Sequence, residues 1–223
     1  MGYAGLPRGT VGFLAGLDAE NDRGWFEAHR AEYERDFLGG GLDLVAALSG
    51  PCAELGLLAV PKTNGSLRRI FRDVRFSKDK RPYEPRLHII LSTRQAFNKV
   101  SGVHLVISGQ GIGYGAGWYG LEPAALEGYR QRILDPVQRD AFKALLSQAA
   151  TVGARLDAPD LARVPKGYEP APWDSLLRRK SVIVRTEPVA PHPDWLFGPD
   201  AVSGWMAIVG ALAPLARWLV PAD

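Results

Sequence analysis

Charged side chains are concentrated in one short stretch of the sequence, residues 68–86. It holds eight lysine and arginine residues against three acidic ones, a balance of +5, whereas the rest of the chain sums to −2. Ser77, Lys78 and Lys80 fall on a polar turn, and the proline after Arg81 holds that arginine in an extended conformation. Two lysines, an arginine and a hydroxyl on one turn are suited to binding phosphate or carboxylate. The stretch therefore predicts an anion-binding site.

Alternation of side chains before that turn indicates a strand over residues 68–76. On such a strand Arg72 shares one face with apolar side chains: Ile70, Val74 and Phe76. An arginine on an apolar face needs a carboxylate, a carbonyl oxygen or a bound anion, because an unpaired buried charge is strongly unfavourable. Asp73 points to the opposite face. We therefore expect Arg72 to be largely buried and paired with an acid from another element or with a ligand.

A second basic and aromatic cluster, residues 163–168, lies in a long proline-rich connection over residues 153–172. A connection of this length inside a domain is usually functional or tightly packed. We expect Arg163 or Lys166 to close the anion site from this connection. The predicted ligand-binding residues are then Arg72, Asp73, Arg75, Ser77, Lys78, Lys80, Arg81, Tyr83, Arg163 and Lys166.

The acidic residues among these bases leave a second chemistry open. Asp73, Asp79 and Glu84, with Lys78 and Lys80 beside them, could hold Mg²⁺ for a metal-dependent phosphotransfer or nuclease-like reaction. Acids interspersed among bases more often form ion pairs, so a structural or partner-binding domain is a third alternative. The sequence has no serine nucleophile elbow and no histidine pair with zinc-protease spacing. Catalytic residues, a metal site and a cofactor are therefore not identified.

Composition narrows the partners and the location. Basic residues interleaved with aromatic ones would suit nucleic acid. However, the rest of the chain is slightly acidic and a polymer needs a longer track, so we expect a small anionic ligand first. The longest apolar stretch, residues 205–219, is short of a membrane span, and no signal-peptide pattern opens the chain. With a single cysteine, Cys52, and no internal disulfide, we expect a cytoplasmic protein that does not enter a membrane.

The motif over residues 72–83, with Arg-Asp, Arg-Phe-Ser-Lys-Asp-Lys and Pro-Tyr, resembles that of the family called domain of unknown function 2461. The resemblance extends from the apolar and aromatic residues at 13–33 to residues 165–180. The chain departs from the family pattern at Glu20, Glu84 and Ala171. At the last two positions the family often has lysine and histidine. The resemblance implies a family but no activity.

The elements that must position the basic stretch indicate an α+β fold. Strand patterns lie at residues 68–76, 87–92, 103–108, 112–119 and 181–185. Helical patterns run from Asn21 or Asp22 to the triple glycine at 39–41, and then over 43–50, 123–134, 137–150 and 200–219. Because strands and helices do not alternate, we expect a mainly antiparallel sheet with the helices of both ends packed against it. The length fits a single domain, residues 1–223.

Glycine alternates along the predicted strand 112–119, at Gly113, Gly115 and Gly117. A dinucleotide-binding glycine loop follows a strand and opens a helix, whereas these glycines lie inside a strand. Alternate glycines on one face indicate that another backbone, a helix or a ligand approaches closely. We expect packing here and no phosphate loop.

Overall fold

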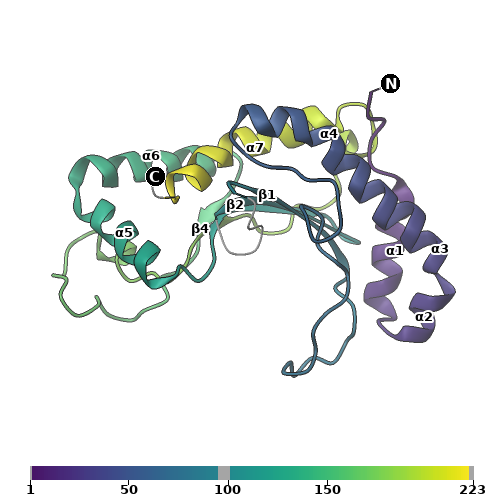
Figure 1. Ribbon diagram of the computed structural model, residues 1–223, viewed down its shortest axis with the longest axis horizontal. Coiled ribbons are helices and arrows are strands. Elements are labelled where there is room, and N and C mark those ends of the chain that lie inside the picture. The colour runs from purple at the N-terminus through teal and green to yellow at the C-terminus, as the bar shows by residue number, and fades with distance from the viewer. Residues whose placement is uncertain (1, 95–100, 221–223) are drawn as a thin grey trace.

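A five-stranded antiparallel sheet forms the centre of the computed structural model, which describes residues 2–94 and 101–220 (Figure 1). The strands lie in the order β1-β2-β3-β5-β4, and each neighbouring pair is antiparallel. Their bounds are β1 (Arg86–Ser92), β2 (Gly102–Ser108), β3 (Ile112–Trp118), β4 (Arg155–Leu156) and β5 (Val182–Arg185). Alternate residues of β1 and β2, among them Leu87, Ile89 and Leu105, are fully buried in the core. The predicted α+β class is confirmed.

Helices from the N-terminal and C-terminal parts of the chain pack on the sheet. Two further helices form a lobe at the end of the sheet away from the N-terminal helices (Figure 1). The N-terminal set is α1 (Arg8–Ala19), α2 (Arg23–Ala28), α3 (Arg30–Glu32), the π-helical segment η1 (Tyr33–Gly39) and α4 (Gly40–Glu54). The lobe contains α5 (Pro123–Leu134) and α6 (Pro136–Ala150), and short 3₁₀ turns η2 (Asp174–Leu176) and η3 (Asp194–Phe197) precede α7 (Ala201–Trp218). Contacts of α4 with β1, and of α7 with β2 and β3, join the helices to the sheet.

Among the described residues, α7 is the one helix long and apolar enough to cross a membrane. It is packed as a core helix, however, with Trp205, Val209 and Leu212 fully buried. Arg132 of α5 donates hydrogen bonds to the carbonyl oxygens of Trp218 and Leu219, at the C-terminal end of α7. These contacts explain the apolar character of the helix by its place in the core.

The N-terminal helical region continues through the triple glycine at 39–41, where the sequence predicted an end. A Cβ atom on Gly40 would lie 2.8 Å from Cδ of Pro7, and one on Gly41 would lie 3.0 Å from Cδ1 of Leu87. The glycines are therefore present for close packing of the helix against the N-terminal segment and β1, and they do not end it.

The glycines of β3 confirm that another backbone approaches closely. A Cβ on Gly115 would lie 2.4 Å from the carbonyl oxygen of Val184, and one on Gly117 would lie 2.0 Å from that of Val182. Both oxygens belong to β5. On Gly113 the nearest atom to an added Cβ lies 4.0 Å away, on Val106. The glycine pattern is thus a packing feature of the β3–β5 pair.

The predicted strand over 68–76 is wrong. Residues 68–85, which we call the arm, form two extended legs that project from the sheet (Figure 1). Two backbone hydrogen bonds, from Arg72 to Pro82 and from Glu84 to Ile70, and one bridge between Phe71 and Tyr83 join the legs. The prolines of the returning leg have no N–H to donate, so a regular ladder cannot form.

The sequence analysis did not predict strand β4. This strand is only two residues long and leaves no alternation to detect in the sequence.

Candidate anion-binding site

The base of the arm is fastened to the N-terminal helices by Asn21 and Tyr83. The side-chain amide of Asn21 donates to the carbonyl of Tyr83 (3.1 Å), and its oxygen accepts from the N–H of Tyr83 (3.0 Å). The ring of Tyr83 stacks on Phe26 with centroids 4.3 Å apart and an interplanar angle of 12°. The helix-capping role that the sequence left open between two residues belongs to Asp22, which accepts from the N–H of Trp25. The base of the arm is therefore attached through its returning leg.

Several arginines of the arm are paired with the arm's own acids. Arg75 binds both carboxylate oxygens of Asp73, at 2.9 and 2.7 Å. Arg72 donates to Asp79 (2.7 Å) and to the carbonyl of Arg81 (3.1 Å). The expectation of a partner from another element or a ligand was wrong for Arg72, and its side chain is half-buried at 23% exposure. The reason is that the arm stands off from the sheet and folds back on itself.

These pairs keep the acids of the arm ionised. The hydrogen bond from the N–H of Arg81, followed by that from the Arg72 guanidinium, lowers the pKa of Asp79 to about 2. The guanidinium of Arg75 likewise lowers the pKa of Asp73. A carboxylate with such a partner acts as an internal counterion of the arm.

The acids of the arm do not gather into a metal site. Glu84 is bound to Arg86 at 2.7 Å, as Asp73 and Asp79 are bound to their own arginines. In the part of the chain that the structure describes, no three His, Cys, Asp or Glu side chains are placed to hold a metal ion. Among the described residues there is therefore no set of metal ligands for the metal-dependent phosphotransfer or nuclease-like reaction.

A groove of about 330 Å³ lies between the base of the arm and β1. Its walls contain four arginines, two acids, a phenylalanine and a histidine: Arg68, Arg69, Arg72, Arg86, Asp73, Glu84, Phe71 and His88. Two of the arginines are tied to acids, as described above. Arg68 and Arg69 form no ion pair with any described residue. The groove therefore offers two guanidinium groups to an anion without breaking an existing pair.

His88 of the groove contacts a second histidine, His104 of the neighbouring strand β2. His88 Nε2 and His104 Nδ1 are 2.9 Å apart. Burial lowers the pKa of His88 to about 3 and that of His104 to about 4, and the charge of Arg68 contributes to both shifts. Both rings are therefore neutral at neutral pH, one donating to the other. Sequence reasoning missed the pair, although a histidine on each of two consecutive predicted strands was a detectable signal.

The predicted tip residues lie beyond this groove, at the turn between the two legs. Lys78 and Lys80 are exposed, and Lys80 donates to the carbonyl of Val74 at 3.0 Å. Ser77 is half-buried, and its N–H donates to the same carbonyl at 3.3 Å. The tip thus adds positive charge to the arm.

Arg163 and Lys166 are not brought to the arm. Their connection packs against α5, where the hydroxyl of Tyr168 donates to Glu127 and Arg130 lies over the Tyr168 ring at 5.6 Å. Figure 1 shows this connection and the arm at opposite ends of the sheet. Sequence spacing contains no information on which end of a sheet a long connection reaches, so the two basic clusters could not be separated in advance.

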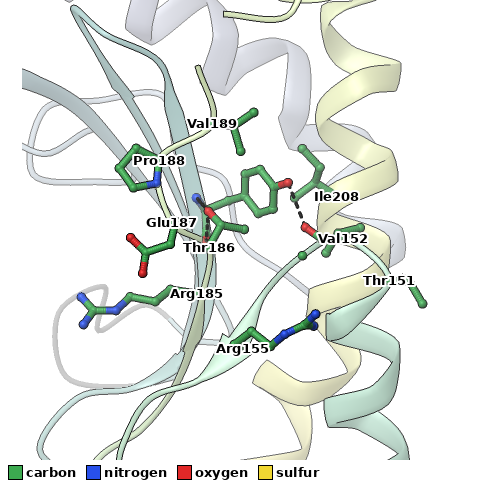
Figure 2. Close-up of a pocket in the computed structure, with 11 residues that line it drawn as sticks. Thr151, Val152, Arg155, Arg185, Thr186, Glu187, Pro188, Val189 and Ile208 are labelled. Atoms are coloured by element: carbon green, nitrogen blue, oxygen red, sulfur yellow. Dashed lines mark hydrogen bonds between the residues drawn. The ribbon is translucent and has the colours of Figure 1, made fainter. Parts of the chain in front are cut away.

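A second cavity, of about 620 Å³, opens beside β5 and the turn that follows α6. Figure 2 shows Arg185 and Glu187 on one side of the strand, and Val152 and Ile208 on the other. Arg185 is paired with Asp157 at 2.9 Å. The hydroxyl of Tyr114 already donates to the carbonyl of Val152 at 2.9 Å. This cavity retains a single arginine, Arg155, outside the ion pairs, so it suits an anion less well than the groove.

Comparison with known proteins agrees with the family resemblance of the sequence. The model of a family described as conserved hypothetical protein (DUF2461) matches residues 9–218, a range that includes the arm, the groove and both histidines. No curated protein and no solved structure matches the chain.

Proposed function

We propose a function from the groove itself, because the chain belongs to DUF2461, a family of conserved hypothetical proteins whose description supplies no activity. The groove binds an anionic ligand that contains phosphate groups. The observation that supports this most is that Arg68 and Arg69 both line the groove and form no ion pair with any described residue. Arginine is the side chain best suited to phosphate, because its planar fork can donate two parallel hydrogen bonds.

The surroundings favour the same ligand. Arg72 and Arg86 stand beside the two unpaired arginines, and each keeps its own acid, so the local potential is positive without any unpaired carboxylate to repel an anion. Hydrogen bonds between such charged groups are stronger than neutral ones, and stronger still when a concave wall excludes water.

The proposal changes the roles of the residues predicted from the sequence. Asp73, Arg75 and Tyr83 set the shape of the arm, since each is bound within it or to its base. Lys78 and Lys80 contribute charge at the tip. The protein acts in the cytoplasm in this proposal, as its composition predicts.

The proposal is tested by binding of inorganic tripolyphosphate, followed by calorimetry and by thermal unfolding at low salt. Tripolyphosphate is expected to raise the melting temperature of the wild type, because a ligand that binds only the folded state stabilises it. The Arg68→Ala/Arg69→Ala variant should lose this shift. Removing these exposed or half-exposed cations should itself change stability little.

The matched control is Arg163→Ala/Lys166→Ala, which removes the same charge from the connection at the other end of the sheet. It should bind tripolyphosphate as the wild type does. A wild type whose melting temperature does not respond would overturn the proposal. An equal loss in both double variants would assign the effect to net charge and overturn the groove as its site.

A further inference from the structure

One phenylalanine, Phe71, is among the residues that line the groove. Phe71 is a large apolar residue, yet its side chain is 48% exposed. Its ring is fixed by contacts with Phe26 (5.7 Å between centroids) and with Tyr83 (5.6 Å). Phe71 lines the groove together with Arg68 and Arg69. A flat apolar ring next to guanidinium groups is arranged for a ligand that combines phosphate with an aromatic group.

A second aromatic side chain lies at the tip of the arm. Phe76 is 94% exposed, which is unusual for phenylalanine in a folded chain. The guanidinium of Arg75 lies 5.8 Å from its ring centroid, and Lys78 is exposed two residues later. Among the described residues none buries this ring, so its flat face is available to a ligand that comes to the arm.

The arm connects these two rings. From Arg69 to Phe76 one extended leg spans at most roughly 25 Å. The whole basic stretch of residues 68–86 keeps a charge of +5 although some of its arginines are paired internally. A compact basic turn would be too short for a polymer, but an extended arm supplies the longer track that a nucleic acid requires.

We infer that the ligand is single-stranded nucleic acid, with phosphates at Arg68 and Arg69 and bases stacked on Phe71 and Phe76; this rests on the proposed function and adds the class of ligand to it. Stacking of bases on aromatic side chains along a positive track is how single strands are bound without sequence preference. In a duplex the base faces are covered by their neighbours, and Phe71 in its groove cannot reach them. A membrane surface could contact only Phe76 at the tip, because Phe71 lies in the groove. A free nucleotide bound in the groove is too small to contact Phe76 as well.

The experiment measures fluorescence anisotropy with a labelled oligothymidylate. The comparison ligands are an abasic strand with the same number of phosphates, a duplex, and vesicles of anionic lipid. We expect tighter binding of oligothymidylate than of the abasic strand. Phe71→Ala and Phe76→Ala should each weaken it at least about fivefold, the lower end of the effect of one stacked base. Arg69→Ala should reduce the slope of log affinity against log salt by about 0.7.

Two matched variants separate stacking from folding. Phe76→Leu keeps an apolar side chain without a flat ring and should bind as weakly as Phe76→Ala, whereas Phe76→Trp should restore affinity. Because Phe76 is almost fully exposed, these changes leave the fold intact even if Phe71→Ala disturbs the base of the arm.

The outcomes are distinguishable from those of the proposed function. Equal affinity for oligothymidylate and the abasic strand, with tripolyphosphate still bound, would overturn the nucleic-acid inference and leave the anion site in place. Absence of binding by every anion would overturn both. Tighter binding of the duplex or of vesicles than of the single strand would replace the inferred ligand and overturn the inference.

Discussion

The ring that accepts the hydrogen bond between His88 and His104 must be neutral, and burial favours the neutral form of the donating ring as well. Burial lowers the pKa of these rings from 6.5 to about 3 and about 4. The unfolded chain therefore binds more protons than the native one below pH 6.5, and stability falls as the pH is lowered from there towards 4. The ionised acids of the arm do not produce this loss, because depressed carboxyl pKa values act below the unfolded value of 3.8.

We predict that the free energy of unfolding in urea changes little between about pH 7 and pH 8 and decreases between pH 6.5 and pH 4. A His88→Asn/His104→Asn variant should lose most of this dependence, whereas His192→Asn, on the segment before η3, should retain it. A wild type equally stable at pH 7 and pH 5 would contradict the assigned role of the pair.

The glycines of β3 differ in how much space they leave for the Cβ atom of an alanine. Gly117→Ala would place its methyl group against the carbonyl of Val182, at a residue with a φ of 150°, which alanine rarely adopts. Gly113→Ala meets nothing closer than 4.0 Å. We expect the first change to destabilise the protein by about 2–4 kcal/mol and the second by less than about 1 kcal/mol. Urea unfolding of the two variants measures this difference, and similar losses would show that β5 does not constrain β3.

At the scale of elements, the arm depends on its attachment to the N-terminal helices. Asn21 provides both a donor and an acceptor to the backbone of Tyr83, so Asn21→Ala leaves two partly buried backbone groups without partners. We expect a loss of about 1–3 kcal/mol and faster hydrogen exchange at the N–H of Tyr83. Asn21→Asp keeps the acceptor and should recover part of the protection of that N–H. Unchanged exchange in Asn21→Ala would show that the stacking of Tyr83 on Phe26 alone holds the arm.

The sequence predicted the elements that form the core and failed at the arm. Strands β1, β2 and β5 were found because their β-branched and apolar residues are the ones that the core buries, and β3 was found because a glycine turn follows β2. Residues 68–76 show a similar alternation, and Arg72 and Val74 are indeed less exposed than their neighbours. However, alternation only records which side chains face inward. It does not show whether a partner strand is present to complete the hydrogen bonds.

At the scale of the whole molecule, the candidate site could be predicted in part. The basic stretch was located from charge alone, but the groove, the two arginines without an ion pair to any described residue and the histidine pair depend on how the base of the arm lies against β1. Ion pairing decided which cations remain available: Arg75 and Arg81 are held by acids two residues away, whereas Arg68 and Arg69 are not. The distance between the arm and Arg163 is a property of the tertiary fold and is absent from any local pattern.

The internal counterions of the arm have a consequence for what the protein can sense. Asp73 and Asp79 remain ionised far below neutral pH, and the pKa of Arg75 is raised further by its carboxylate. The charge of these pairs is therefore constant across the range of acidity that a cell experiences. Contacts between an exposed arm and a polyanion are instead screened by dissolved ions within about 8 Å at physiological concentration. The arm would thus respond to the concentration of salt in its surroundings and remain indifferent to changes in acidity.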